Sequence, residues 1–409
     1  MPISPLRSGP LKTTWPKERL EAEGLWHYAP EITGYPSDST VQLSHGGEMD
    51  LLGSYSYLGL LGHPEIQEAT HRAIDHFGTG THGVRLLAGT LSIHRELEQE
   101  IAKFIGVEDA VVYSSGYAAN LSILSAVMSA GGLIIADRLI HASLVDGCAL
   151  SGAEVVRFKH SSPQALRMCL EEAEPDRPVL VVIDGIYSME GDLAPLPEIL
   201  ALVKEFGVSL MVDEAHSIGV AGTTGRGICE QFRVSPHEVD ILMGTFSKAL
   251  PASGGYAAGS KEICDFLRLQ SRGFIYSGAL SPSVAAAALA ALKIIQREPE
   301  RVWDLRLKTM MFHTLLKEEG IPHRPGESPI VPIMCGTSQQ AWEIAAACQK
   351  RGVFVQAIVP PVVPEGQARL RAAVNVAHTE CQLKRIVKVL RTAFQEVGVP
   401  LNEAVGGAK

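Results

Sequence analysis

From about residue 50 to residue 281, short apolar runs alternate with longer stretches in which apolar residues recur at helical spacing. The run at 179–183 is apolar without interruption, which predicts a strand buried on both faces of a sheet. The alternation of strands with helices predicts an α/β fold with a mainly parallel sheet. Ligands of such sheets bind beyond the carboxyl ends of the strands, so the polar residues found there are candidate site residues. The predicted strands are 109–113, 132–136, 154–158, 178–183, 208–212 and 241–243.

The alternation of strands and helices does not extend to the two ends of the chain. Residues 1–49 contain prolines that interrupt any long element, and we interpret them as an N-terminal arm with a helix near 17–26. Residues 50–282 form the predicted large domain. Residues 283–409 begin with an alanine-rich helix at 283–297 and are predicted to form a smaller C-terminal α+β domain. Its strand candidates are 330–334, 354–357 and 368–374.

Composition narrows the possible functions. The chain has 409 residues, of which 46% are apolar and 20% charged, as expected for a globular protein of two domains. A net charge of -9 without basic runs argues against a nucleic-acid partner. No apolar run is long enough to cross a bilayer, and residues 1–15 lack the apolar core of a signal peptide. Seven cysteines without paired spacings favour free thiols in the cytoplasm and argue against a metal site.

The most informative residue is Lys248, which follows the strand at 241–243 and is preceded by small hydroxyl residues. A lysine amine in such a place can form a Schiff base with an aldehyde cofactor. Asp213 follows the preceding strand and can pair with the pyridinium nitrogen of pyridoxal phosphate (PLP), which lets the ring act as an electron sink. An aspartate at this place is more commonly a helix N-cap. The glycines after His216 indicate close backbone approach and favour the cofactor interpretation.

A phosphate site is predicted where Ser115, Gly116 and Tyr117 follow the strand at 109–113 and open a helix. The start of a helix offers free N–H groups and the positive end of its dipole to an anion. Thr245 and Ser247, close to the lysine, would add hydroxyl donors to the same phosphate. Without the lysine, a plain strand-to-helix turn or a turn cap would explain these segments as well or better.

Two histidines complete the predicted site. His141 follows the strand at 132–136 and can stack its imidazole on the cofactor ring. His216 can donate a hydrogen bond to the phenolic oxygen of that ring. A single histidine after a strand is usually structural, so both roles depend on Lys248 and Asp213.

Taken together, these segments resemble the α-oxoamine synthases, a branch of the fold-type I PLP-dependent transferases, over residues 50–390. The resemblance implies a mainly parallel seven-stranded sheet flanked by helices, PLP as the cofactor, and a homodimer with the site at the subunit interface. The matching segments are Tyr57-Leu58-Gly59-Leu60, Gly89-Thr90 with His94, Ser115-Gly116-Tyr117-Ala118-Ala119-Asn120, His141-Ala142-Ser143 with Asp146-Gly147, Tyr187-Ser188-Met189 with Gly191-Asp192, Ala194-Pro195-Leu196, Asp213-Glu214-Ala215-His216-Ser217, Gly244-Thr245 with Lys248, and Ala368-Arg369-Leu370-Arg371 with Ala377-His378.

The resemblance also implies a role for each matching residue. Lys248 would be the Schiff-base lysine, Asp213 the pyridinium partner and His141 the stacking residue. Ser188 and His216 would contact the polar edge of the cofactor.

Substrate and subunit contacts follow in the same way. Arg371 matches the arginine that binds the amino-acid carboxylate. Arg369 lies on the same face of the predicted strand, so spacing alone leaves both arginines open, and only the resemblance selects Arg371. Ser277 would donate to the phosphate from the neighbouring subunit.

The implied reaction joins a small amino acid to an acyl thioester, carried by coenzyme A or by an acyl carrier protein. Carbon dioxide is lost and an α-amino ketone forms. Lys248 would remove the α-proton as a neutral amine, so burial and neighbouring positive charge should lower its pKa. A PLP aminotransferase is the alternative from another class, since it shares the fold, the aspartate and the lysine.

Single residues suggest which branch of the family applies. Tyr55 and Phe246 favour a serine palmitoyltransferase-like enzyme with a long acyl chain and a role in sphingolipid biosynthesis. The alternatives are 8-amino-7-oxononanoate synthase and glycine C-acetyltransferase. Val84 and Leu86 replace the polar residues of the aminolevulinate-forming members, so a succinyl substrate is disfavoured. The presence of Lys248 argues against an inactive partner subunit of the family. A dehydrogenase is disfavoured because the chain lacks a Gly-x-Gly-x-x-Gly turn after its first strand.

Overall fold

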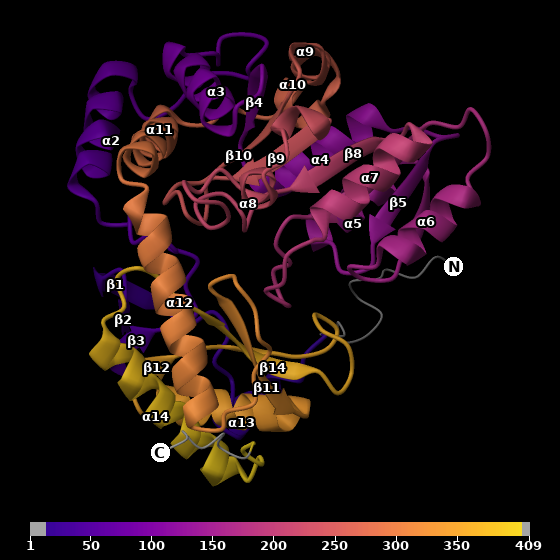
Figure 1. The fold of residues 1–409 in the computed structure, drawn as a ribbon. Coiled ribbons are helices and arrows are strands. Elements are labelled where there is room, and N and C mark those ends of the chain that lie inside the picture. Colours follow the sequence, from indigo (N-terminus) through magenta and orange to yellow (C-terminus); the bar gives the residue numbers. More distant parts are fainter. Residues whose placement is uncertain (1–13, 403–409) are drawn as a thin grey trace, which may run out of the picture.

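A seven-stranded sheet dominates the computed structural model, which describes residues 14–402 (Figure 1). The strand order is β4-β10-β9-β8-β7-β5-β6, and within this sheet only β10 runs antiparallel to its neighbours. The predicted α/β class with a mainly parallel seven-stranded sheet is therefore confirmed. The strands are β4 (Asp109–Tyr113), β5 (Leu133–Asp137), β6 (Glu154–Phe158), β7 (Val179–Asp184), β8 (Ser209–Asp213), β9 (Ile241–Thr245) and β10 (Gly255–Gly259).

Helices cover both faces of this sheet, because alternate residues of each strand point to opposite sides. Leu133 and Ile135 of β5 join one hydrophobic core, while Ile134 and Ala136 join the other. The first core includes α3 (Ser92–Ile105), α6 (Pro163–Glu171), α7 (Leu196–Phe206) and α11 (Pro282–Arg297), and the second includes α4 (Gly116–Val127), α5 (Ala142–Ser151) and α9 (Lys261–Gln270). Shorter or outer elements are α2 (Pro64–Phe77), α8 (Ile228–Phe232), η1 (Pro236–Glu238) and α10 (Arg272–Ile275).

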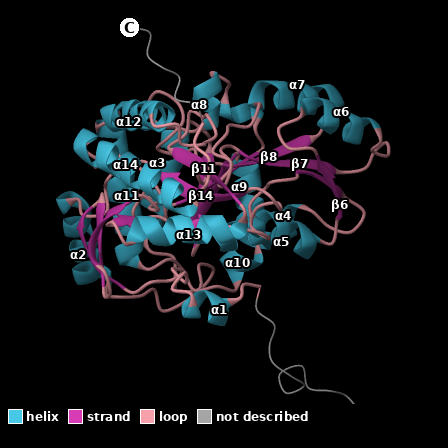
Figure 2. Cartoon of the chain, turned by 90° about the horizontal axis from the view of Figure 1, so that it is seen from below, coloured by secondary structure: helices cyan, strands magenta, loops and turns pink. Residues whose placement is uncertain are grey.

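A separate core surrounds a three-stranded antiparallel sheet of order β11-β14-β13. Helix α12 (Glu300–Glu318) leads from the large sheet to this part of the molecule (Figure 1). Helices α12, α13 and α14 gather around the small sheet (Figure 2). The bounds are β11 (Ile330–Gly336), β13 (Ala357–Ile358), β14 (Ala368–Ala373), α13 (Ser338–Gln349) and α14 (Glu380–Val397).

The N-terminal part also carries strands. The inner strand β3 (Gly47–Leu51) pairs in parallel with the edge strand β12 (Val353–Phe354), so an N-terminal and a C-terminal segment share a four-stranded sheet. A single strand at 354–357 is therefore wrong, because β12 and β13 belong to different sheets. The remaining elements are α1 (Lys17–Ala22), β1 (Ile32–Ser37), β2 (Thr40–Leu43) and β3 (Gly47–Leu51).

The predicted boundaries 1–49, 50–282 and 283–409 stay a prediction, and residues 1–13 and 403–409 lie outside the described part of the chain. Within residues 14–402, none of the helices combines the length and the apolar character needed to cross a membrane.

Candidate functional site

A cavity of about 330 Å³ opens at the carboxyl edge of the large sheet. Strands β7, β8 and β9 each contribute residues at or just beyond their carboxyl ends, as expected for a ligand site in such a sheet. Most of the predicted site residues therefore meet at one place. Those that line the cavity are Ser115, Gly116, Tyr117, His141, Ser188, Asp213, His216, Thr245, Ser247 and Lys248.

The start of α4 forms one wall. The Ser115 hydroxyl accepts a hydrogen bond from the N–H of Ala118 at 3.0 Å, so this serine caps the helix as well as facing the cavity. Gly116 lies so close to Thr245 that a Cβ would meet the threonine Oγ1 at 2.9 Å. Glycine is therefore required for the close approach between the helix and the end of β9. Tyr117 points its hydroxyl to Asp146.

The two hydroxyl residues near the lysine differ in their freedom to donate. Thr245 donates to the carbonyl of Gly254 at 2.9 Å, and its oxygen lies 2.9 Å from that of Ser247. Because the Thr245 proton is committed to a carbonyl, the Ser247 hydroxyl is the donor in the contact between the two residues, and it would have to turn from Thr245 to reach an anion in the cavity.

Asp213 is held by two hydrogen bonds. The amide of Asn120 donates to Oδ2 at 2.7 Å, and the N–H of Ala215 donates to Oδ1 at 2.8 Å. Both bonds stabilise the ionised carboxylate. Burial raises the pKa of the neighbouring Asp184 well above its usual value, and the negative charge of Asp213 adds to the rise.

Lys248 has the lowered pKa that the chemistry requires. Burial lowers its pKa to about 8, with a contribution from Arg371, while Asp213 opposes the shift. The amine is therefore partly neutral near physiological pH and can act as a base or a nucleophile.

Both histidines are neutral in this setting. Burial lowers the pKa of His141, and its Nδ1 lies 2.7 Å from the hydroxyl of Ser143. Burial lowers the pKa of His216 well below its usual value, and its Nδ1 lies 2.8 Å from the hydroxyl of Tyr57. Because burial also raises the pKa of Tyr57 to about 12, that hydroxyl keeps its proton and can donate to Nδ1. His216 then carries its own proton on Nε2 and can donate from there.

The two candidate arginines have different surroundings. Arg369 is fully buried and pairs with Glu190 at 3.1 Å, and it also donates to the carbonyls of Gln367 and Met189. Arg371 donates from Nε to the carbonyl of Ser188 at 2.7 Å.

What remains free on each guanidinium separates the two. The Nη2 of Arg371 is buried without a hydrogen-bond partner among the described residues, and the guanidinium lies over the ring of Tyr55 at 4.7 Å. A buried donor without a partner is costly, so the Nη2 of Arg371 is available to an incoming acceptor.

Three residues of this region were not among the predicted site residues. Tyr55 lines the cavity and packs on Arg371, while Asn120 fixes Asp213 from the middle of a helix. Asp184, the last residue of β7, also lines the cavity. Its position at the end of a strand is the sequence signal by which it could have been predicted. Ser277 does not line the cavity, although its hydroxyl lies 3.5 Å from that of Ser114 at the neighbouring turn.

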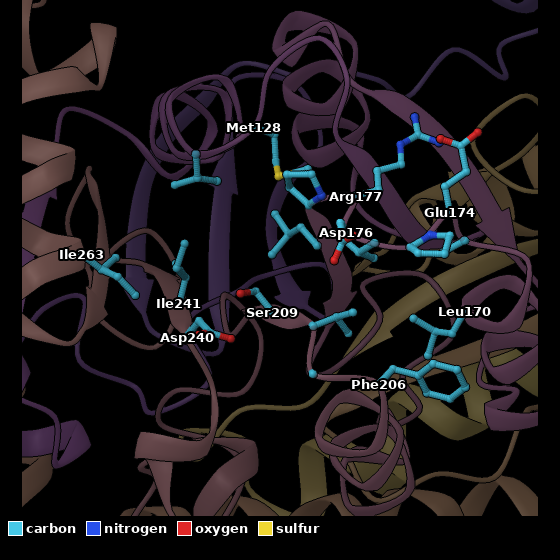
Figure 3. A pocket seen from close by; sticks show the side chains of 18 residues that line it. Met128, Leu170, Glu174, Asp176, Arg177, Phe206, Ser209, Asp240, Ile241 and Ile263 are labelled. Carbon is cyan, nitrogen blue, oxygen red and sulfur yellow. The ribbon is translucent and has the colours of Figure 1, made fainter.

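A larger cavity of about 690 Å³ lies at the opposite edge of the sheet (Figure 3). It is bordered by Ser209 and Ile241, the first residues of β8 and β9. The arginine in its lining, Arg177, already donates to Glu154 and to two carbonyls. This cavity is remote from the lysine, and we assign it no part in the chemistry.

The sequence is similar to those of known proteins over most of its length. The model for aminotransferase class I and II matches residues 48–390. The chain is 40% identical over 384 residues to the 8-amino-7-oxononanoate synthase of Geobacter sulfurreducens, with 93% of this chain and 97% of that protein covered. It is 37% identical over 378 residues to the serine palmitoyltransferase of Bacteroides ovatus, with 92% and 95% covered.

A solved structure of a related enzyme has the same fold over most of the chain. The serine palmitoyltransferase of S. paucimobilis, with bound PLP and myriocin, matches with a TM-score of 0.91 at 33% identity, covering 94% of this chain and 97% of that one. The chain therefore belongs to the α-oxoamine synthase family of the class I and II aminotransferases.

Proposed function

We propose that this protein is a PLP-dependent acyltransferase that condenses a small amino acid with an acyl thioester, with loss of carbon dioxide. The observation that carries the proposal is that Lys248 and Asp213 line one cavity at the edge of the large sheet, and that Arg371 packs on Tyr55, which lines the same cavity. The relatives of the chain include acyltransferases of this kind.

PLP fits the residues that line the cavity. The start of α4, with Gly116 and Ser247 beside it, would hold the phosphate. Asp213 would pair with the ring nitrogen, His141 would stack on the ring, and Lys248 would form the Schiff base. Bound in this way, PLP supplies an electron sink for the negative charge that develops on the amino-acid α-carbon.

The remaining cofactor contacts lie at the rim of the ring. His216, protonated on Nε2, would donate to the phenolic oxygen, and Ser188 would approach the same polar edge. Tyr117 and Ser115 would border the phosphate, with Thr245 behind it.

The protein's own groups would divide the work on the amino acid. Arg371 would bind the carboxylate through its free Nη2, which fixes the orientation of the α-carbon over the cofactor. Lys248 would take the α-proton onto its neutral Nζ and later return a proton to the product.

A groove on the far side of Lys248 suits the acyl group. It has a volume of about 610 Å³ and shares Tyr55, Ser247 and Lys248 with the cofactor cavity. Apart from Lys248 its lining contains no arginine, lysine or carboxylate, and its polar side chains are hydroxyls together with Gln67 and His71. Its apolar lining consists of Tyr35, Leu61, Ile66, Pro251, Ala252, Val284 and Ala287.

The apolar part of this lining supports a serine palmitoyltransferase-like enzyme with a long aliphatic thioester and a role in sphingolipid biosynthesis. The second candidate is an 8-amino-7-oxononanoate synthase. It is supported by sequence identity, which is 40% to the Geobacter synthase and 37% to the Bacteroides serine palmitoyltransferase. Glycine C-acetyltransferase and aminotransferase activities remain alternatives for the same assay to test.

We also propose a homodimer with Ser277 facing the phosphate site of the neighbouring subunit. Three large apolar side chains are exposed close to this segment: Leu86 is 48%, Leu87 82% and Tyr276 71% exposed. Val84 pairs with Gly278, so the two loops form one surface. The cysteines within the described residues are free thiols, which supports the cytoplasm as the compartment.

The test begins with the visible absorption band of the PLP-loaded protein, titrated with glycine, alanine, serine and threonine. Serine alone should shift the band, and addition of palmitoyl-CoA should then release free coenzyme A thiol. A preference for alanine with thiol release from pimeloyl-CoA would transfer the proposal to the second candidate. Amino transfer to a keto acid without thiol release would contradict both. The Lys248→Ala variant is the control, because it should release no thiol with any pair.

A further inference from the structure

The loop that follows β7, residues 187–192, is tied to the large sheet by His160. The Nδ1 of His160 lies 3.0 Å from Asp137 at the end of β5, and its Nε2 lies 2.9 Å from Asp192 in the loop. The ring of Tyr187 meets the imidazole edge to face, with 4.4 Å between the ring centroids. The loop itself is closed by a hydrogen bond from the N–H of Tyr187 to the carbonyl of Asp192 at 3.0 Å.

The other side of the same loop holds the C-terminal part of the chain. Three of its main-chain carbonyls accept hydrogen bonds from side chains on or beside the small sheet. The pairs are Ser188 O with Arg371 Nε at 2.7 Å, Met189 O with Arg369 Nη1 at 2.9 Å, and Gly191 O with Ser328 Oγ at 2.6 Å. The loop is therefore the connection that sets where Arg371 lies relative to Lys248.

We propose that His160, bridging Asp137 and Asp192, is a positioning residue that fixes Arg371 for the amino-acid carboxylate. This inference rests on the proposed function. His160 does not line the cofactor cavity, so it acts only through the loop. With the bridge in place, the carbonyl of Ser188 is held still and accepts a hydrogen bond from Arg371, which fixes the guanidinium in a single orientation.

The charges around His160 make the bridge strong. The ionisable groups that face the ring are Asp137, Asp192 and Tyr187. Burial alone would lower the pKa of His160, but the hydrogen bonds to the two aspartates outweigh it and raise the pKa to about 10. The ring therefore donates from both nitrogens at physiological pH. Asp137 is further fixed by N–H groups of Leu139 and Ser161, both at 2.8 Å.

The decisive experiment compares a ligand that has a carboxylate with one that lacks it. His160→Gln is loaded with PLP, and its absorption band is titrated with serine and with serinol, or with alanine and alaninol if the wild type binds alanine. The dissociation constant of the amino acid should rise about tenfold, while that of the amino alcohol stays at the wild-type value. PLP affinity should stay unchanged as well.

A second variant separates this role from folding. Asp192 is partly exposed, so Asp192→Asn should fold and should weaken amino-acid binding in the same direction but less. The matched control is Arg167→Gln, which removes an ion pair with Glu205 at 2.6 Å between α6 and α7, away from the loop. It should change neither constant.

Four outcomes decide the matter. A loss confined to the ligand with the carboxylate supports the proposal. Equal losses for both ligands would show that His160 only stabilises the fold, and no loss in either variant would also overturn the proposal. A wild-type protein that responds to no amino acid would instead remove the proposed function, and this inference with it.

Discussion

The chemistry of this site depends on how single residues are charged, and Asp213 shows it most directly. Its carboxylate receives hydrogen bonds from Asn120 and from the N–H of Ala215, which leaves its charge available to the cofactor nitrogen. Asp213→Asn keeps the shape but removes the charge, so thiol release should fall about a hundredfold or more, since hydrogen bonds to charged groups are the strong ones. The matched control is Asp240→Asn. The carboxylate of Asp240 accepts a hydrogen bond from the N–H of Leu210 at the opposite edge of the sheet. An equal loss of rate in the control would contradict the assignment.

The pKa of Lys248 gives a second prediction at this scale. Burial favours the neutral amine, so below about pH 8 the side chain is mostly protonated and above it mostly neutral. In cofactor-free protein, modification of Lys248 by an amine-reactive reagent should rise with a midpoint near pH 8, as followed by peptide mass spectrometry. Asp213→Asn removes a charge that raises this pKa, so the midpoint should move lower. A midpoint near 10 in both proteins would contradict the burial argument.

At the scale of elements, the contact between the start of α4 and the end of β9 leaves no room for a side chain. Gly116→Ala would place a Cβ 2.9 Å from the Thr245 Oγ1 and force the helix start away from the strand. PLP affinity should fall about tenfold or more while the fold persists, and the absorption band measures it during dilution. Gly34→Ala is the control, because its Cβ would meet open space. Unchanged PLP affinity in Gly116→Ala would show that the phosphate lies elsewhere.

The same scale shows why parts of the fold escape the sequence. The β-branched strands that are buried on both faces were found within two residues of their ends, because their apolar pattern is unmistakable. Strand β10 was missed since its sequence, Gly-Tyr-Ala-Ala-Gly, has no β-branched residue. Small residues are needed there because a Cβ on Gly255 would lie 2.6 Å from Gly116 Cα. That requirement comes from tertiary contact and leaves no local signal.

Site residues divide in the same way. Lys248 and Asp213 could be recognised because they follow strands and carry distinctive chemistry. Asn120 lies in the middle of α4, where an asparagine has no periodic or capping signal, and only the folded chain brings it to Asp213. Strand periodicity places Arg369 and Arg371 on one face and left both open, and only the family resemblance selected Arg371. Their partners, which come from the loop at 187–192, distinguish them.

For the whole molecule, the exposed apolar surface around Leu87 bears on the proposed homodimer. Burying a side chain that is 82% exposed in a single chain would favour association. Leu87→Asp should lower the mass seen by light scattering toward that of one chain, and should weaken PLP binding if Ser277 serves the neighbouring site. Met168→Asp is the control, because Met168 is 62% exposed on α6, in a different part of the surface. A monomeric wild type, or an unchanged mass in Leu87→Asp, would contradict the proposed interface.

The antiparallel strand β10 has a mechanical consequence for the lysine. Because β10 returns beside β9, the segment from 246 to 254 is a hairpin with both ends anchored in the sheet. Its base is locked by a hydrogen bond from the N–H of Phe246 to the carbonyl of Gly254 at 3.0 Å. Lys248 therefore lies in a segment that is held at both of its ends. Arg371 lies on a separate sheet, so its distance from this fixed lysine depends on how the small sheet is held against the large one.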